Sequence, residues 1–432
     1  MNLTTNADYF LGKKSEQKEI SISDMFKNVK EVADKTKEWP VDRIIDVFNE
    51  FSCKILDKNN ILHRLYPNSG LAFIANWCRR ANLEALLDTS LGDRYCLDKF
   101  VESKKRISRA YKAFPVGVVV HWLAGNVPTL GFLSLLQGVL TKNANIIKLP
   151  SGSNNMLTGL LEQISEINIK NYSASELVKS IAIIRHDHSL KNISDAISLN
   201  ANARVIWGND NSVSAVKALP TKLNVNDIVF SNKTSLIVIG RDILENVDIS
   251  ELAGKIATDI SVFEQKACAS PHTIFLETED DTILVKLAES LKKSILSLLG
   301  TMPKTVPSQM EVTVLLNLRA KYDMFHRAWY SDGMEFTILS DDYFKLGPPI
   351  GNRTIYLRKV EELDSITNLI TPKVQSIGIV AMREQYEKLT KLFGEKGVQR
   401  FTQVGTMTFF EVPWDGYFLP QHLVRWTSRF NY

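Results

Sequence analysis

The amino-acid sequence predicts an α/β protein in which a doubly wound parallel sheet is joined to a second α/β domain and to a helical N-terminal region. Two observations lead to this prediction. Apolar residues recur at helical spacing in the N-terminal part, and from residue 114 onward short Val- and Ile-rich runs alternate with helical runs. Such alternation favours right-handed β-α-β crossovers, and ligands of the resulting sheets bind at the carboxyl ends of the strands.

Residues 1–110 are expected to form a helical region that packs on the first sheet. From residue 17 the segment is amphipathic, because apolar side chains return about every three or four positions. Two groups carry this pattern: Met25, Val29 and Val32, and then Ile44, Ile45, Phe48 and Phe51.

Residues 111–225 are expected to form the first α/β domain. The expected strands are 116–122, 145–149, 180–186 and 204–208, and the expected helices are 130–141, 156–167, 190–199 and 212–219. The stretch 114–140 is almost wholly apolar, but Gly117, Gly125 and Pro128 interrupt it. Its first part is rich in Val and its second in Leu, which predicts a buried strand, a tight loop and a buried helix, not a membrane span.

Residues 226–400 are expected to form the second α/β domain, after a boundary near Pro220. Its expected strands are 235–240, 273–276, 353–357 and 376–381, and its expected helices are 249–263, 281–299 and 363–370. We expect the remaining residues, 401–432, to return to the first domain or to an interface between subunits.

Composition excludes several classes of protein. The 432 residues carry a net charge of +4 with no dense basic stripe, which does not suggest nucleic-acid binding. The four cysteines (Cys53, Cys78, Cys96 and Cys268) are widely spaced and form no C-x-x-C pair. This pattern argues against a disulfide framework or a zinc site, and it suits a reducing cytoplasm. The N-terminus lacks the basic and apolar segments of a signal peptide.

Cys268 is the candidate nucleophile. It follows an expected helix, is flanked by small residues, and precedes Pro271 and the expected strand 273–276. A thiol on such a turn is held by rigid elements yet open on one side, as a covalent nucleophile requires. The alternative is that Cys268 is a small buried hydrophobe, the commoner role of an unlinked cysteine. Lys266 and His272 are candidates to activate the thiol, although each has an alternative structural role.

Asn126 is the candidate oxyanion donor. It lies in a loop at the end of the first expected parallel strand, inside a very apolar segment. An amide left without a partner there would cost a few kcal/mol. The side chain therefore either satisfies groups of its own loop or faces the reacting carbonyl of a substrate.

Two other strand ends are candidate cofactor sites. Lys148 lies where the strand 145–149 leaves the sheet, with Ser151 just after it, and a lysine there can meet cofactor hydroxyls or phosphate. Trp207, Gly208 and Asn209 end the strand 204–208 and precede a helix. One glycine is weak evidence for a phosphate site, and a solvated strand-end lysine is the more frequent explanation of Lys148.

Taken in order, these segments resemble the aldehyde dehydrogenase superfamily. The matching positions are Asn126 for the oxyanion asparagine, Lys148 for the lysine at the adenosine ribose, Trp207-Gly208 for the glycine turn under the cofactor, Cys268 for the nucleophile, and Leu346-Gly347-Pro348 for the late Phe-Gly-Pro turn. The resemblance implies that residues 111–225 bind the nicotinamide cofactor and that residues 226–400 carry out catalysis.

A closer resemblance is to the LuxC-like acyl-CoA reductases, the fatty acid reductases of bacterial luminescence operons. It runs from about residue 70 to the C-terminus and includes Gly125-Asn126-Val127-Pro128, Gln265-x-x-Cys268-x-Ser-Pro271 and Leu423-Val424-Arg425-Trp426. It implies NADPH-dependent reduction of a fatty acyl-CoA, or of an acyl group delivered by an acyl-protein synthetase partner, to a fatty aldehyde through a thioester on Cys268. It also implies a homo-oligomer that pairs through the segment 104–116.

Two departures from the classical aldehyde dehydrogenases bear on the reaction. Val229 stands where those enzymes have their general-base glutamate, and Phe344 stands where a glutamate contacts the nicotinamide ribose. The first favours thioester reduction over oxidation to a free acid. Two alternatives stay open: reduction of a shorter acyl thioester or acyl phosphate, and a non-redox subunit that carries the acyl group on Cys268.

Overall fold

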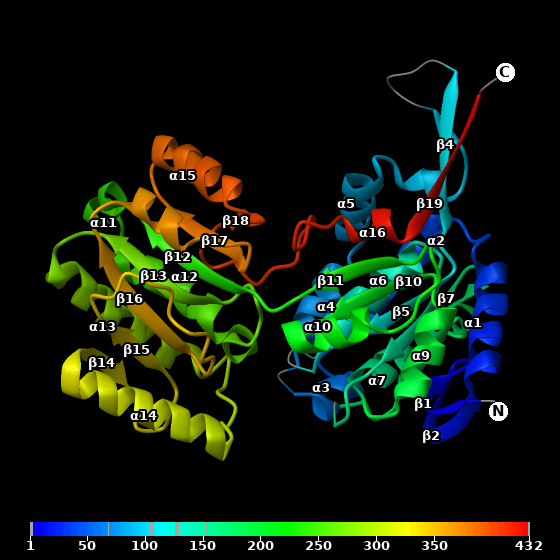
Figure 1. The fold of residues 1–432 in the computed structure, drawn as a ribbon, viewed down its shortest axis with the longest axis horizontal. Coiled ribbons are helices and arrows are strands. Elements are labelled where there is room, and N and C mark those ends of the chain that lie inside the picture. The colour runs from blue at the N-terminus through cyan, green and yellow to red at the C-terminus, as the bar shows by residue number, and fades with distance from the viewer. Residues whose placement is uncertain (1–2, 68, 103–107, 126–128, 153, 431–432) are drawn as a thin grey trace. The chain divides into compact units, whose positions relative to one another are not determined.

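The computed structural model describes residues 3–67, 69–102, 108–125, 129–152 and 154–430. The chain forms two compact units, which are described separately (Figure 1). The first unit contains Met1–Ser231 and Phe410–Tyr432, and the second contains Asn232–Phe409. The unit boundaries thus follow residues 231 and 409, whereas the sequence suggested boundaries after residues 225 and 400.

The first unit is built on a seven-stranded sheet of order β11-β10-β5-β6-β9-β1-β2. Five of these strands are parallel: β5 (Val118–Trp122), β6 (Ala144–Lys148), β9 (Ile181–Arg185), β10 (Ala203–Trp207) and β11 (Asn226–Phe230). The helices among them are α6 (Leu130–Leu140), α7 (Met156–Ser165), α8 (Ala174–Val178), α9 (Lys191–Asn200) and α10 (Asp210–Lys217). The expected parallel α/β sheet is confirmed, and β11 is a strand that the sequence did not predict.

The helical prediction for residues 1–110 is wrong at its start. Strands β1 (Thr4–Phe10) and β2 (Lys13–Ser21) form an antiparallel hairpin, and β1 pairs with β9 to extend the parallel sheet. Because β2 is an edge strand and rich in charged residues, it lacks the apolar run by which a buried strand is recognised. The expected helices follow the hairpin: α1 (Ile22–Thr36), α2 (Val41–Leu56), α3 (Ile61–Leu65), α4 (Leu71–Trp77), α5 (Arg80–Leu91) and the 3-10 turn η1 (Arg94–Leu97).

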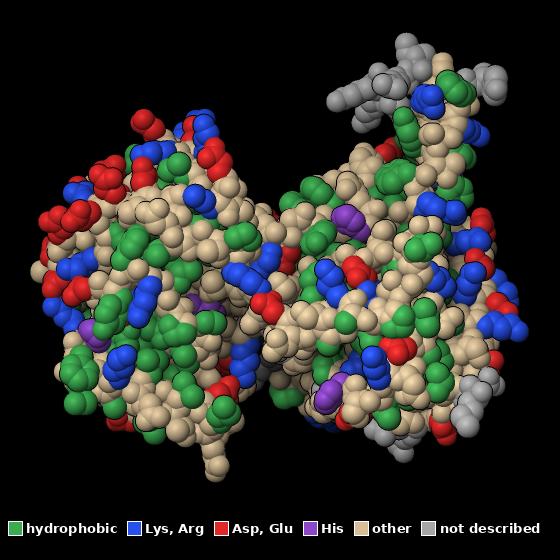
Figure 2. Space-filling view, viewed as in Figure 1, with side chains coloured by type: hydrophobic (Ala, Val, Ile, Leu, Met, Phe, Trp, Pro, Cys, Tyr) green, Lys and Arg blue, Asp and Glu red, His purple; other side chains and the backbone are tan. Residues whose placement is uncertain are grey.

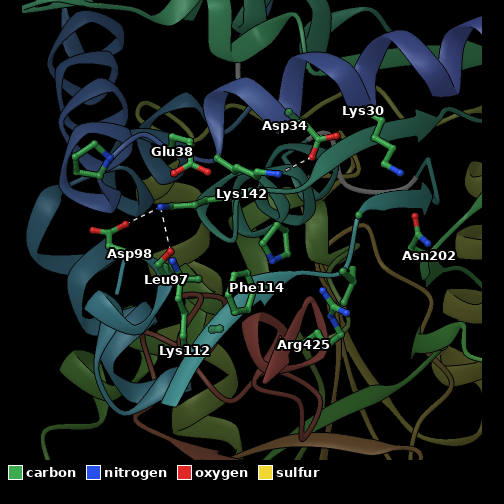
Figure 3. Close-up of a pocket in the computed structure, with 17 residues that line it drawn as sticks. Lys30, Asp34, Glu38, Leu97, Asp98, Lys112, Phe114, Lys142, Asn202 and Arg425 are labelled. Atoms are coloured by element: carbon green, nitrogen blue, oxygen red, sulfur yellow. Dashed lines mark hydrogen bonds and ion pairs between the residues drawn. The ribbon is translucent and has the colours of Figure 1, made fainter. Parts of the chain in front are cut away.

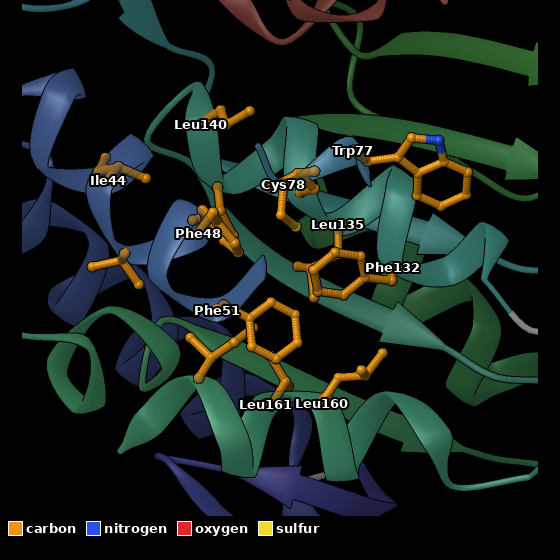
Figure 4. Close-up of a cluster of buried hydrophobic side chains, with 14 of the residues drawn as sticks. Ile44, Phe48, Phe51, Trp77, Cys78, Phe132, Leu135, Leu140, Leu160 and Leu161 are labelled. Atoms are coloured by element: carbon orange, nitrogen blue, oxygen red, sulfur yellow. The ribbon is translucent and has the colours of Figure 1, made fainter. Parts of the chain in front are cut away.

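The largest core of the first unit lies between the N-terminal helices and α6. Phe132 of α6 packs against Phe48 and Phe51 of α2, with ring centroids 6.3 and 5.7 Å apart (Figure 4). Burying such a side chain stabilises a fold by about 1.5–3 kcal/mol. Since α6 is buried on nearly all sides, the Leu-rich second part of the apolar stretch 114–140 belongs to this core. In the described part of the chain no helix has the length and hydropathy needed to cross a membrane.

A smaller antiparallel sheet also belongs to the first unit. Its strands are β3 (Val101–Glu102), β4 (Arg109–Pro115) and β19 (Val424–Phe430), and it extends away from the core of that unit (Figure 1). Trp426 and Phe430 of β19 are 43% and 58% exposed. Hydrophobic and basic side chains lie together on its surface (Figure 2). The remaining short elements of this unit are β7 (Asn168–Ile169), β8 (Tyr172–Ser173) and α16 (Leu419–His422).

The second unit has its own seven-stranded sheet, of order β14-β15-β16-β13-β12-β17-β18. Its strands are β12 (Thr234–Ile239), β13 (Pro271–Glu277), β14 (Arg327–Tyr330), β15 (Thr337–Ser340), β16 (Thr354–Val360), β17 (Val374–Val380) and β18 (Arg400–Thr402). All pair in parallel except β14 with β15. Its helices are α11 (Arg241–Asn246), α12 (Ile249–Ser261), α13 (Asp281–Leu298), α14 (Gln309–Phe325) and α15 (Arg383–Glu395), with 3-10 turns η2 (Val262–Gln265) and η3 (Leu363–Leu369).

Six elements of the second unit were not predicted: α11, α14, α15, β14, β15 and β18. Only Leu315, Arg319 and Tyr322 of α14 are buried, so the helix lacks an apolar stripe. Strands β14 and β15 are four residues long and lie at one edge of the sheet, where alternation of apolar and polar residues is hard to recognise. The expected helix 363–370 is the 3-10 turn η3.

Candidate active site

Cys268 lies on the turn between η2 and β13 of the second unit. Its side chain is partly exposed, whereas the following Ala269 and Ser270 are fully buried. None of the four cysteines, all within the described residues, forms a disulfide. The turn therefore presents the Cys268 thiol from a fixed strand start, which is the arrangement that the sequence predicted for a nucleophile.

The backbone before Cys268 is strained. Phe263, Glu264 and Gln265 have φ values of 52°, 53° and 61°, three consecutive left-handed residues without a glycine. Each such residue costs roughly 1–2 kcal/mol relative to the right-handed conformation. A segment of this kind persists only where its surroundings hold it, and such strain is concentrated at functional sites.

Gln265 holds this segment to the neighbouring strand. Its buried amide nitrogen donates to the carbonyl oxygens of Pro271 (2.7 Å) and Thr354 (2.8 Å). Its amide oxygen accepts from the backbone N–H of Thr354 (2.7 Å). The side chain thus closes the loop around Cys268 and fastens it to the first residue of β16.

Ser235 makes the second tie to the loop. Its hydroxyl, at the start of β12, donates to the backbone carbonyl of Cys268 at 2.7 Å. The same oxygen accepts from the backbone N–H of Ser376 in β17 at 3.2 Å. The backbone of Cys268 is therefore tied to β12 and, through Ser235, to β17, on the side of β13 opposite to β16.

Glu264 is the centre of a buried charge cluster beneath the loop. Its carboxylate accepts from Arg353 (3.0 Å) and pairs with Lys304 (2.8 Å). Its backbone carbonyl accepts from the N–H of Asn352 (3.0 Å). Burial lowers the pKa of Lys304, and the nearby carboxylate opposes that shift. Because these charges face one another, their geometry points to support of the loop.

Lys148 and Ser151 lie at the carboxyl ends of the parallel strands of the first unit. Lys148 ends β6 and is partly buried, and this burial lowers the pKa of its ammonium group while nearby Asp187 opposes the shift. Ser151 is exposed in the turn that follows. Arg185 at the end of β9 donates to the carbonyl of Pro150 at 3.1 Å and so fixes this turn. A desolvated cation at this edge suits an anionic or hydroxyl-bearing ligand.

Trp207 belongs to the core rather than to the surface of that edge. Its ring stacks on Phe230 with centroids 3.8 Å apart, and its indole N–H donates to Ser134 at 3.1 Å. Ser134 also bonds His121 at 2.7 Å, and burial lowers the pKa of that histidine to about 4. Any ligand contact by Trp207 would therefore come from its backbone at the strand end.

Gly208 and Asn209 form the turn from β10 into α10. A Cβ atom on Gly208 would lie 3.0 Å from Cβ of Ser212, so the turn approaches the helix closely. Asn209 caps the helix, its side chain accepting from the backbone N–H of Ser212 at 2.8 Å. The first-turn N–H groups of α10 thus face the same carboxyl edge as Lys148, which fits a polar cofactor.

A family model described as acyl-CoA reductase (LuxC) matches residues 36–426 of this chain. The chain belongs to the LuxC acyl-CoA reductase family. The match begins well before residue 70, so the family pattern also includes most of the N-terminal helices.

Curated relatives of this LuxC-family chain are long-chain acyl-protein thioester reductases. The chain is 28% identical to the one from Photorhabdus luminescens over 351 residues, which are 78% of this chain and 69% of the relative. It is 27% identical to the one from Aliivibrio fischeri over 374 residues, 83% of this chain and 74% of the relative.

Solved structures confirm the aldehyde dehydrogenase-like fold. An indole-3-acetaldehyde dehydrogenase in complex with NAD+ has a TM-score of 0.71 at 12% identity, covering 98% of this chain and 92% of that chain. An acetylating aldehyde dehydrogenase from Geobacillus thermoglucosidasius has a TM-score of 0.65 at 12% identity, covering 94% and 95%.

Two sequence neighbours of Cys268 were candidates to activate the thiol of this LuxC-family chain. Lys266 pairs with Glu311 of α14 at 3.4 Å. His272 is buried, and burial lowers its pKa to about 4, so the imidazole is neutral at pH 7 and supplies no positive charge. Among the described residues no cluster of His, Cys, Asp and Glu could hold a metal ion.

The described site residues of the LuxC-family chain fall in two places. Lys148, Ser151 and the residues 207–209 share the carboxyl edge of the first sheet, and Cys268 lies in the second unit. Asn126 lies outside the described residues. Sequence reasoning missed the structural roles of Ser235 and of Gln265, although Gln265 is part of the motif that carries Cys268.

Proposed function

We propose that the protein reduces a long-chain acyl thioester to a fatty aldehyde with NADPH, by way of a thioester on Cys268. The observation that carries the proposal is the partly exposed thiol on a loop that Gln265 and Ser235 hold in place. Membership of a reductase family and relatives that act on long-chain acyl-protein thioesters support it.

The Cys268 thiolate attacks the carbonyl carbon of the acyl donor and forms a new C–S bond. The bond from that carbon to the donor sulfur then breaks, and the donor leaves as a thiol. The backbone N–H of Cys268 and the side chain of Asn126, whose role rests on the family resemblance, stabilise the oxyanion. Loss of one such donor raises the barrier by about 3 kcal/mol.

Lys148, Ser151, Gly208 and Asn209 are the residues that we propose to hold NADPH, and Trp207 takes part through its backbone. The partly buried Lys148 ammonium and the N–H groups that begin α10 suit hydroxyl and phosphate groups. When bound, NADPH would supply the hydride that reduces the thioester carbon to the aldehyde level, and Cys268 would be released as the thiolate.

Hydrolysis of the acyl-enzyme is expected to be slow. Val229 lies in β11 where the superfamily resemblance places a general-base glutamate, and its side chain cannot activate water. Phe344 is 47% exposed in the loop before Gly347 and offers no carboxylate to a ribose. We therefore infer that the thioester waits for NADPH, so acyl donor alone will label Cys268 without rapid release of fatty acid.

The acyl donor is a fatty acyl-CoA or an acyl group on a synthetase partner. The family description points to the first and the curated relatives to the second. We also propose a homo-oligomer that pairs through β4 and β19, because their sheet extends from the first unit with apolar Trp426 and Phe430 exposed.

The test follows nicotinamide absorbance while the protein is incubated with NADPH and acyl-CoAs of increasing chain length. Cys268→Ala is compared with Cys53→Ala, whose thiol is exposed on α2. Oxidation of NADPH by wild type and Cys53→Ala, but not by Cys268→Ala, supports the proposal, and the chain-length profile separates long from short acyl groups. Label transfer to Cys268 without NADPH oxidation would instead indicate a non-redox acyl carrier.

A further inference from the structure

A cavity of about 550 Å³ lies in the first unit, at the amino ends of the parallel strands and so at the end of the sheet opposite to Lys148 (Figure 3). Gly117 precedes β5, Lys142 precedes β6 and Asn202 precedes β10, and all three line the cavity. Helix α1 and the small sheet of β4 and β19 supply the other walls. The volume is in the range of small-molecule sites, about 300–1,000 Å³.

Lys142 forms the floor of the cavity. Its backbone is left-handed (φ 64°) and its side chain is only 4% exposed, an unusual place for a lysine. The ammonium group donates to the carbonyl of Leu97 (3.1 Å) and to the carboxylate of Asp98 (2.6 Å). Asp98 also accepts from the backbone N–H of Val41 at 3.0 Å. Two of the three N–H bonds of Lys142 are thus used, and one is left for a ligand.

Lys30 of α1, Asn202 and Arg425 of β19 line the side of the cavity that lies away from Asp98 (Figure 3). The oxygen of the Asn202 amide accepts from the N–H of Val118 at 2.9 Å, which leaves its NH₂ group as a donor. Within the described ranges, neither Lys30 nor Arg425 pairs with a carboxylate. Lys30 and Arg425 are therefore two cations of the cavity lining that no described carboxylate neutralises, since the nearby Asp34 pairs with Lys37.

The cavity as a whole carries more positive than negative charge. Its lining has five basic residues (Lys30, Lys37, Lys112, Lys142 and Arg425) and three acidic ones (Asp34, Glu38 and Asp98). Two of the basic residues are already paired, Lys37 with Asp34 at 2.9 Å and Lys142 with Asp98. Phe114 and Pro115 give one wall an apolar surface. An anion with an organic part matches this combination.

We propose that this cavity binds a small phosphate-bearing organic molecule, with the phosphate between Lys30 and Arg425 and the organic part against Phe114. The planar guanidinium of Arg425 suits two phosphate oxygens, and the Asn202 amide and the Lys30 ammonium supply further donors. The site is separate from the carboxyl edge at Lys148, because it lies where the strands of the same sheet begin.

The test titrates the full chain with phenyl phosphate, and separately with inorganic phosphate, by isothermal calorimetry at constant ionic strength. Arg425→Ala and Lys30→Ala are compared with two controls. Lys27→Ala removes a cation from the same helix that pairs with Glu31 and does not line the cavity, and Lys148→Ala alters the other edge of the sheet. Thermal unfolding without ligand checks that each variant is folded.

We expect phenyl phosphate to bind wild type at one molecule per chain and more tightly than inorganic phosphate does. Arg425→Ala and Lys30→Ala should each weaken binding about tenfold or more, which corresponds to about 1.4 kcal/mol, while both controls bind as wild type does. The proposal is overturned if wild type does not bind phenyl phosphate, or if Lys148→Ala abolishes the binding and Arg425→Ala does not.

Discussion

Replacing Gln265 with leucine is expected to slow the acylation of Cys268 while leaving most of the protein intact. Leucine has a similar volume but no polar atoms. It would remove the side-chain donor from the carbonyls of Pro271 and Thr354, and it would leave the N–H of Thr354 only its longer bond to the Gly351 carbonyl (3.1 Å). Each unsatisfied buried group costs about 1–3 kcal/mol. The native loop therefore loses on the order of 3 kcal/mol or more.

The hydrogen bonds lost in Gln265→Leu belong to a loop that is already strained. The left-handed residues 263–265 are held in part by the bonds of Gln265, so the loop of Gln265→Leu is expected to relax and to move the Cys268 thiol. If about 3 kcal/mol of positioning is lost from the transition state, the rate of acylation falls roughly 100-fold.

The assay measures a single round of acylation with excess acyl-CoA, by mass of the protein, together with thermal unfolding. Gln385→Leu is the matched control, because Gln385 donates at 2.8 Å to Glu277 at the far end of β13. Gln265→Glu keeps an acceptor for Thr354 but loses both donated bonds, so it should also be slow. Acylation of Gln265→Leu at the wild-type rate would refute the positioning role of Gln265.

Three further outcomes follow from the structure. Ser235→Ala removes the bond to the Cys268 carbonyl and should slow single-turnover acylation roughly tenfold, with a small change in thermal unfolding. Burial lowers the pKa of His272 from 6.5 to about 4, so the unfolded chain binds a proton more tightly than the folded chain does. The contribution of neutral His272 to the free energy of unfolding is therefore complete above pH 6.5 and is lost as the pH falls toward 4. In urea unfolding, His272→Gln should lose less stability than wild type over this pH range. Gly138→Ala places a Cβ 2.0 Å from the Asn145 amide oxygen and should lower the free energy of unfolding in urea by about 1–3 kcal/mol.

The strands that the sequence predicted best are those buried on both faces. Strands such as β5, β6 and β10 read as short continuous apolar runs, because helices cover both sides of a parallel sheet. The hairpin of β1 and β2 was missed because β2 has a polar sequence and its pairing with β1 is antiparallel. Helix α14 was missed for a related reason, since a helix that buries few side chains shows little periodicity.

The site was only partly predictable because its parts come from distant segments. The turn at Cys268 could be recognised from a local pattern of small residues followed by proline. The partners that hold it could not, since Thr354 is 89 residues from Gln265 and Ser376 is 141 residues from Ser235. Only the order of strands in the sheet brings these backbone groups together.

These distant partners explain how the loop before Cys268 keeps its strained, left-handed backbone conformation. The left-handed residues before Cys268 include no glycine, so their strain is balanced by bonds from strands β12 and β16, while β17 fixes Ser235 of β12. Those strands belong to the central part of the second sheet, where parallel neighbours on each side limit their movement. The position of the thiol therefore depends on several strands of the sheet, and we expect substitutions such as Gln265→Leu to slow acylation without touching the reacting atoms.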